Sequence, residues 1–254
     1  MVKLTRVQST LLMAALITSS LEALPIQAAI RQQPQQLPTA IQGTYLATSV
    51  GEIVDSLGRK KGPGGGRPGN RRGLICALAP MKLVDQDTKP QENQGIQEVW
   101  SDHPLFLWTI PEGGVEKIEL FQEGNDTALW SRPIPQGKTS IIYDGEALKP
   151  GQSYEWRLTP VGSFAQRQLP FQVMAGEERD RITAELRQLE ARLKNASAET
   201  RALEKADYFA KKELWSDALR ELYSVSKPSA ELTKAIKQIQ DYDFCTQKPK
   251  NSAS

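Results

Sequence analysis

The sequence predicts an α+β protein in which an antiparallel β-sandwich is followed by a small C-terminal helical region. Between residues 74 and 175, short apolar or alternating runs are separated by glycine, proline, asparagine and aspartate, as in strands joined by turns. From residue 176 onward, apolar residues recur every three or four positions, which is the helical period. With 39% apolar residues and a net charge of +2, the composition is that of an ordinary soluble globular protein.

Seven short runs are the candidate strands of the sandwich. They are Leu74–Ala79, Leu105–Ile110, Val115–Gln122, Ala128–Ser131, Thr139–Tyr143, Tyr154–Thr159 and Leu169–Met174. The run from Tyr154 to Leu158 alternates cleanly between apolar and polar residues, which is typical of a strand with one buried face. We therefore predict a sandwich domain over residues 74–175.

Four helices are predicted in residues 176–243, followed by a tail over residues 244–254. The first runs roughly from Glu177 to Lys194 and the second from about Glu199 to Glu213, the third contains Trp215 and Leu222, and the fourth begins near Pro228. Proline suits the first turn of a helix, where its missing N–H is not needed. Acidic and basic residues balance along this region, so its polar faces are expected to be solvated.

The N-terminal residues 1–28 resemble a secretory signal peptide in their arrangement. Lys3 and Arg6 precede the uncharged run Leu11–Ile17, and Ile26–Ala28 follows as a candidate cleavage site. The apolar run is shorter than the roughly 20 residues that cross a bilayer. We expect an extracytoplasmic protein, periplasmic or secreted, that does not span the membrane after cleavage; a buried N-terminal helix is the alternative.

Residues 29–73 are predicted to be a disordered lead followed by a basic, glycine-rich segment. The stretch Arg59–Gly73 holds six glycines and six basic residues but no acid. Arg67, Arg71 and Arg72 are the candidate anion-binding residues, and an acidic glycan or a membrane surface is the expected partner class, with an unknown protein as another. The alternative is a solvated, flexible linker.

The chain has two cysteines, Cys76 and Cys245, near the two ends of its ordered part. In an oxidising compartment they are candidates for a disulfide that encloses most of the fold. Two separate thiols, one in a buried strand and one in a mobile tail, are the alternative. Neither cysteine belongs to a C-x-x-C motif, so redox catalysis is not expected.

Charge and composition argue against several classes of function. The balance of 32 basic against 30 acidic residues does not suit a nucleic-acid binder. One histidine and two cysteines are too few for a structural zinc site, and we expect no metal and no cofactor. His103 follows Ser101 and Asp102 directly, and three consecutive residues do not form a catalytic triad, so we expect a turn residue. We therefore expect no enzyme and name no catalytic residue.

Five tryptophans raise the question of a sugar-stacking surface. Trp108, Trp156 and Trp215 occupy positions predicted to face the core, whereas the roles of Trp100 and Trp130 stay open. A pair of carboxylates for glycoside cleavage is a property of the fold rather than of the sequence. A secreted hydrolase acting on glycan is therefore the alternative function.

Three stretches resemble parts of two known modules. Residues 148–158, with Tyr154 and Trp156, are similar to the strand E to strand F crossing of fibronectin type III-like domains, and Trp108–Pro111 is similar to their second strand. The resemblance implies a fibronectin/immunoglobulin-like sandwich in which the Tyr154 hydroxyl bonds to upstream backbone. Residues 206–219 resemble a single tetratricopeptide-type helical hairpin, which has to pack on a neighbour because it cannot bury its own face.

The order of segments resembles a cyanobacterial secreted family known as domain of unknown function 928. The matching strings are Gly62–Gly73 with Cys76, Pro104–Pro111, and Ala210 with Leu214–Leu219. The resemblance implies a location outside the cytoplasm and no established activity. Together with the composition, it predicts a non-catalytic extracytoplasmic binding or scaffolding protein.

Overall fold

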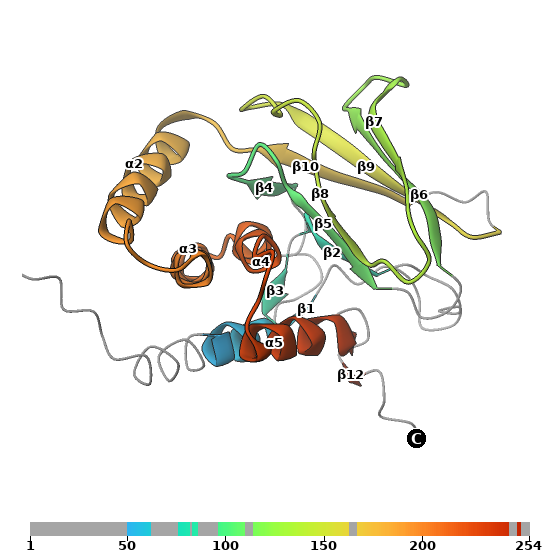
Figure 1. Ribbon diagram of the computed structural model, residues 1–254. Helices are drawn as coiled ribbons and strands as arrows, with labels where there is room; N and C mark the ends of the chain where they lie inside the picture. Colours follow the sequence, from blue (N-terminus) through green and yellow to red (C-terminus); the bar gives the residue numbers. More distant parts are fainter. Residues whose placement is uncertain are drawn as a thin grey trace, which may run out of the picture. The chain divides into compact units, whose positions relative to one another are not determined.

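The computed structural model describes residues 50–61, 76–81, 83–85, 96–109, 114–162, 167–243 and 248–249. All of them belong to one compact unit that spans residues 38–254 (Figure 1). The expected signal peptide, residues 1–28, lies outside the described residues. None of the described helices is both long enough and apolar enough to cross a membrane.

The larger sheet has five strands in the order β4-β10-β9-β6-β7. Their bounds are Gln97–Val99 (β4), Arg167–Val173 (β10), Ser153–Pro160 (β9), Val115–Gln122 (β6) and Ala128–Pro133 (β7). Neighbours are antiparallel except that β4 runs parallel to β10. The sequence does not predict β4, because three residues are too short a run to show a period.

The smaller sheet has three strands in the order β2-β5-β8. Their bounds are Cys76–Ala79 (β2), Leu105–Thr109 (β5) and Ser140–Ile142 (β8), and both pairs are antiparallel. Each of the seven predicted runs therefore overlaps a strand of one of the two sheets, and β4 is an eighth strand that was not predicted. Which strands belong to which sheet is information that only the structure supplies.

The two sheets share one apolar core. Phe106 and Trp108 of β5 face Trp156 of β9 and Phe171 of β10, and all four side chains are fully buried. The rings of Phe106 and Trp156 lie 5.0 Å apart between centroids and tilted to each other. Such tilted aromatic pairs stabilise a core beyond the area they bury.

The three-stranded sheet is buried on both faces. All five residues of β5 are buried: Phe106 and Trp108 belong to the core between the sheets, whereas Leu105 and Leu107 belong to a second core on the opposite face. This arrangement explains the unbroken apolar run, since a strand covered on both sides has no polar face. The second core is completed by helices.

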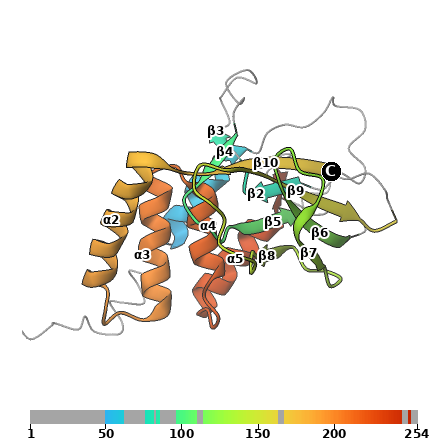
Figure 2. The same cartoon turned by 90° about the horizontal axis from the view of Figure 1, so that it is seen from above.

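Four of the helices follow the two sheets in sequence. They are α2 (Gly176–Arg192), α3 (Ala198–Lys211), α4 (Trp215–Tyr223) and α5 (Ala230–Asp241), and Figure 2 shows α2, α3 and α4 side by side. Ser197 and Ser229 cap α3 and α5, each accepting a backbone N–H three residues on. The four helices confirm the prediction for residues 176–243, but Pro228 precedes the cap instead of occupying the first turn.

The helices pack on the outer face of the smaller sheet. Leu203 of α3, Trp215 and Leu219 of α4, and Leu232 of α5 are buried in the second core together with Leu107. The α3–α4 pair thus buries its apolar face against the sheet, as a lone helical hairpin must. The third core, beneath α2, contains Ile182, Leu186 and Leu189 of α2.

Residues 50–58 form a helix that the sequence did not predict, since residues 29–73 were assigned to a disordered lead and a basic, glycine-rich segment. Val50, Ile53 and Leu57, spaced three and four apart, are buried in the second core. Short helices are rarely stable alone, and residues 50–58 are stabilised by this packing. Its apolar spacing is present in the sequence but is interrupted by Gly51 and followed by Gly58.

Two short ladders complete the described chain. Lys60–Lys61 (β1) pairs with Val84–Asp85 (β3), and Tyr242–Asp243 (β11) pairs with Lys248–Pro249 (β12), both antiparallel. The second ladder includes part of the stretch predicted as a tail, residues 244–254. With both sheets and five helices among the described residues, the chain is an α+β protein.

Candidate functional site

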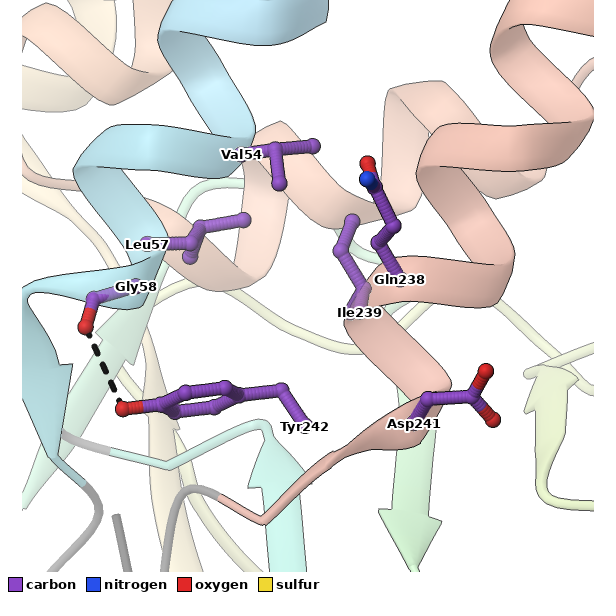
Figure 3. A pocket seen from close by; sticks show the side chains of 7 residues that line it. All are labelled: Val54, Leu57, Gly58, Gln238, Ile239, Asp241 and Tyr242. Atoms are coloured by element: carbon purple, nitrogen blue, oxygen red, sulfur yellow. Dashed lines mark hydrogen bonds between the residues drawn. The ribbon is translucent and has the colours of Figure 1, made fainter. Parts of the chain in front are cut away.

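A cavity of about 300 Å³ lies between helix 50–58 and the C-terminal end of α5 (Figure 3). Its walls come from two parts of the chain that are 180 or more residues apart. The lining residues are Val54, Leu57 and Gly58 from the first helix, Gln238, Ile239 and Asp241 from the end of α5, and Tyr242, the first residue of β11. Cavities of this size are at the lower end of the range that holds small ligands.

The walls of this cavity are apolar, and one end is closed by a tyrosine. Leu57 is fully buried and Ile239 is 2% exposed, so both belong to the second core and hold the walls in place. The Tyr242 ring lies across the gap between the helices, and its hydroxyl donates a 3.3 Å hydrogen bond to the Gly58 carbonyl oxygen (Figure 3). The result is a trough between two helices with a fixed end.

Two polar side chains stand at the rim of the cavity, and one of them is paired. Gln238 is exposed, and the carboxylate of Asp241 points away from Val54 and Leu57 in Figure 3. Asp241 forms an ion pair of 2.8 Å with Lys237, one helical turn before it. The cavity therefore meets a ligand mainly with hydrocarbon, while charges stand at its edge.

The basic segment starts beside this cavity. Gly58 lines the cavity, and Arg59, Lys60 and Lys61 follow it directly as the first three of the six basic residues. The predicted anion-binding residues Arg67, Arg71 and Arg72 lie outside the described residues. The basic segment therefore begins at the residue that follows the cavity wall.

Two other cavities are lined by charged residues that pair with each other. One, of about 290 Å³, lies against other residues of helix 50–58 and holds the Lys211–Asp207 pair at 2.6 Å. The other, of about 380 Å³, holds Lys205, which is 3.3 Å from both Glu190 and Glu221. Of these three cavities, the one beside Tyr242 has the most apolar walls.

Cys76 is bonded in a disulfide and is 3% exposed. Cys245 is the other cysteine of the sequence and lies outside the described residues. The pairing of Cys76 with Cys245 stays a prediction.

His103 lies in a bend and pairs with its neighbour. Its Nδ1 is 2.8 Å from the Asp102 carboxylate, while the Ser101 hydroxyl accepts the backbone N–H of His103 instead of facing the ring. The polar groups of these three residues therefore bond to one another, as is typical of a turn. Among the described residues, no group of three or more histidine, cysteine, aspartate and glutamate side chains is placed to hold a metal ion.

The two tryptophans whose roles the sequence leaves open both take part in structural contacts. Trp100 donates its indole N–H to Thr183 at 3.1 Å and packs against Phe209. Trp130 is 6% exposed and donates its indole N–H to Asp144 at 2.6 Å. Trp108, Trp156 and Trp215 are buried in the cores as predicted.

The sequence does not reveal the most unusual polar residue, Asp217 of α4. Its side chain is buried and accepts the backbone N–H groups of Trp100 at 2.9 Å and Ser101 at 2.8 Å. Burial raises the pKa of Asp217 to about 6, although these two donors and the Arg220 charge act in the opposite direction. This carboxylate joins α4 to the chain that follows β4.

No curated protein matches the chain. A family model with the description "Domain of Unknown Function (DUF928)" matches residues 64–242, which is well over half of the 254 residues. The match covers the basic segment from Gly64, both sheets and α2 to α5, and helix 50–58 precedes it. The chain therefore belongs to the DUF928 family.

Proposed function

We propose that this protein is a non-catalytic binding or scaffolding protein that works outside the cytoplasm and attaches to an anionic surface through Arg59–Gly73. The observation that carries the proposal is the docking of helix 50–58. Val50, Ile53 and Leu57 tie this helix to the second core, and the acid-free basic segment begins one residue after it ends. Because the basic segment is joined directly to this docked helix, binding of the segment to a surface would also hold the folded part of the protein there.

The rest of the proposal concerns the type of scaffold. A fibronectin-like arrangement is supported by Tyr154, whose hydroxyl accepts the backbone N–H of Lys149 at 2.9 Å. A tetratricopeptide-like hairpin is supported by the close packing of α3 on α4, where Ala206 and Ala218 are both fully buried. Both modules commonly present surfaces for binding, but a fold alone does not define an activity.

Binding to anionic vesicles tests the attachment. Replacing Arg67, Arg71 and Arg72 together by Gln is expected to weaken binding, and binding of the unaltered protein is expected to fall as salt screens the charges. The matched control replaces three exposed cations, Arg187, Arg192 and Lys194, by Gln, and so removes the same charge from the helical region. Equal binding by the two triple variants would contradict the proposal.

Export is tested separately. The proposal requires that protein recovered from outside the cytoplasm begin at or near Ala29. N-terminal sequencing of that material checks it, and recovery of an intact Met1 form from the cytoplasm alone would contradict it.

A further inference from the structure

We propose that the cavity between helix 50–58 and α5 binds one acyl chain of an anionic membrane lipid. This inference rests on the proposed function, since it names the molecule that the protein meets at the anionic surface. It also assigns a ligand class to a cavity lined by Val54, Leu57, Ile239 and Tyr242.

The form and lining of the cavity favour a hydrocarbon chain. Val54 and Leu57 on one helix and Ile239 on the other form the two sides of a trough, and the Tyr242 ring closes its end (Figure 3). A linear hydrocarbon chain matches the form of a trough between two helices, and every methylene that leaves water contributes to binding. The cavity of about 300 Å³ limits the ligand to part of one chain.

The charges beside the cavity favour an anionic headgroup. Arg59, Lys60 and Lys61 follow the lining residue Gly58 directly in sequence, and the stretch Arg59–Gly73 holds six basic residues but no acid. The chain that leads away from this end of the cavity therefore carries an excess of positive charge. Asp241 points away from the cavity and is paired with Lys237 at 2.8 Å, so it repels an anion weakly. A single acyl chain and a polybasic segment are each weak membrane attachments, but together they hold a protein at a membrane.

Photochemical labelling of the mature protein by lipid vesicles tests the proposal directly. The probe is a phosphatidylglycerol vesicle that carries a small fraction of the same lipid with a diazirine in its acyl chain. After illumination, mass spectrometry is expected to find labels at Val54, Leu57, Ile239 or Tyr242. Vesicles of phosphatidylcholine with the matching diazirine lipid are expected to give about tenfold less label.

Two variants fill the cavity and one serves as the control. Val54→Trp places a large side chain in the trough from one wall, and Gln238→Trp does so from the exposed rim of the other, where no core residue is disturbed. Either change is expected to lower labelling of the cavity about tenfold, because the added indole ring occupies the volume that several methylenes of the acyl chain would fill. Gly51→Trp adds the same side chain to an exposed position of the same helix with no atom within 4 Å of its Cβ, and labelling is expected to persist.

The outcomes separate this inference from the proposed function. If vesicles sediment the protein but the labels lie elsewhere, or if both filling variants are labelled like the unaltered protein, the acyl-chain site is wrong and surface attachment stands. If phosphatidylcholine labels the cavity equally, the headgroup assignment is wrong. If vesicles of neither lipid sediment the protein, the proposed function fails. Monomeric lysophosphatidylglycerol that carries the diazirine then tests whether the cavity binds an acyl chain. If the cavity is not labelled by this lipid, the inference is overturned as well.

Discussion

The carboxylate of Asp217 accepts the backbone N–H of Ser101 at 2.8 Å, across 116 positions of sequence. Its second oxygen accepts the N–H of Trp100 at 2.9 Å. Nearby, Arg220 donates to the His103 carbonyl oxygen at 2.7 Å, so α4 is bonded repeatedly to the chain between β4 and β5. These bonds hold the helical region to the sheets by polar contacts in addition to the second core.

Replacing Asp217 by Ala is expected to lower the free energy of unfolding by roughly 1–3 kcal/mol, because two backbone donors lose their acceptor. Asp207→Ala on α3 is the control: it removes a partly exposed ion pair with Lys211 and should cost less than about 1 kcal/mol. Urea titrations of both variants provide the measurement. Equal losses would contradict the role assigned to Asp217.

Asp217 also predicts a specific pH dependence. Its folded pKa of about 6 lies above the ordinary value of 3.8, so the folded state binds the proton more tightly than the unfolded state. The contribution of this proton to stability is complete below pH 3.8 and is lost as the pH rises through 6. The unfolding free energy of the unaltered protein minus that of Asp217→Asn is therefore expected to rise by roughly 2 kcal/mol between pH 7 and pH 4. A flat difference would show that the carboxylate does not titrate in this range.

Tyr154→Phe removes the hydroxyl that accepts the Lys149 N–H and is expected to cost about 1–3 kcal/mol. Tyr208→Phe is the matched control, because its hydroxyl bonds to the Glu185 side chain at the surface of the helices. Denaturant melts compare the two. An unchanged midpoint for Tyr154→Phe would argue against the fibronectin-like corner.

We expect a single disulfide between Cys76 and Cys245. Replacing both by Ser should lower stability by about 4–5 kcal/mol on the chain-entropy estimate for a loop of this length. Non-reducing peptide mapping of the exported protein identifies the bond. Two thiols that react with alkylating reagent in the unfolded, unreduced protein would contradict the pairing.

Leu57→Ala tests whether helix 50–58 is part of the fold. The side chain is fully buried in the second core, so its truncation is expected to cost about 2–5 kcal/mol. Asp55 is exposed on the same helix, so Asp55→Ala should leave the free energy of unfolding nearly unchanged. If both variants melt like the unaltered protein, the helix is not docked in solution.

The strands of the two sheets other than β4 were predictable because each has its own sequence pattern, but the elements that cover them were not. The run Leu105–Thr109 indicates a strand, yet nothing in it shows that helices cover one face and a second sheet the other. Seven of the nine residues of α4 are buried, the charged Asp217 and Glu221 among them. Sequence periodicity assigns such charges to a solvated face, because it does not contain the tertiary partners that enclose them.

The candidate site was less predictable than the fold. Val54 and Leu57 lie in a stretch whose neighbours are glycine-rich and charged, so the sequence favours disorder there. Ile239 and Tyr242 lie at the other end of the chain, where Ile239 reads as an ordinary core position. A cavity between segments so far apart exists only through the docking of two helices, and neither helix shows it alone.

The double burial of the three-stranded sheet has a consequence for how this chain can be divided. Truncation after residue 175 would uncover Leu78, Leu105 and Leu107, a row of apolar side chains on a short sheet. Such a surface favours aggregation over independent folding. The change of composition near residue 175 marks a switch from strands to helices. It is not a boundary between domains that fold independently.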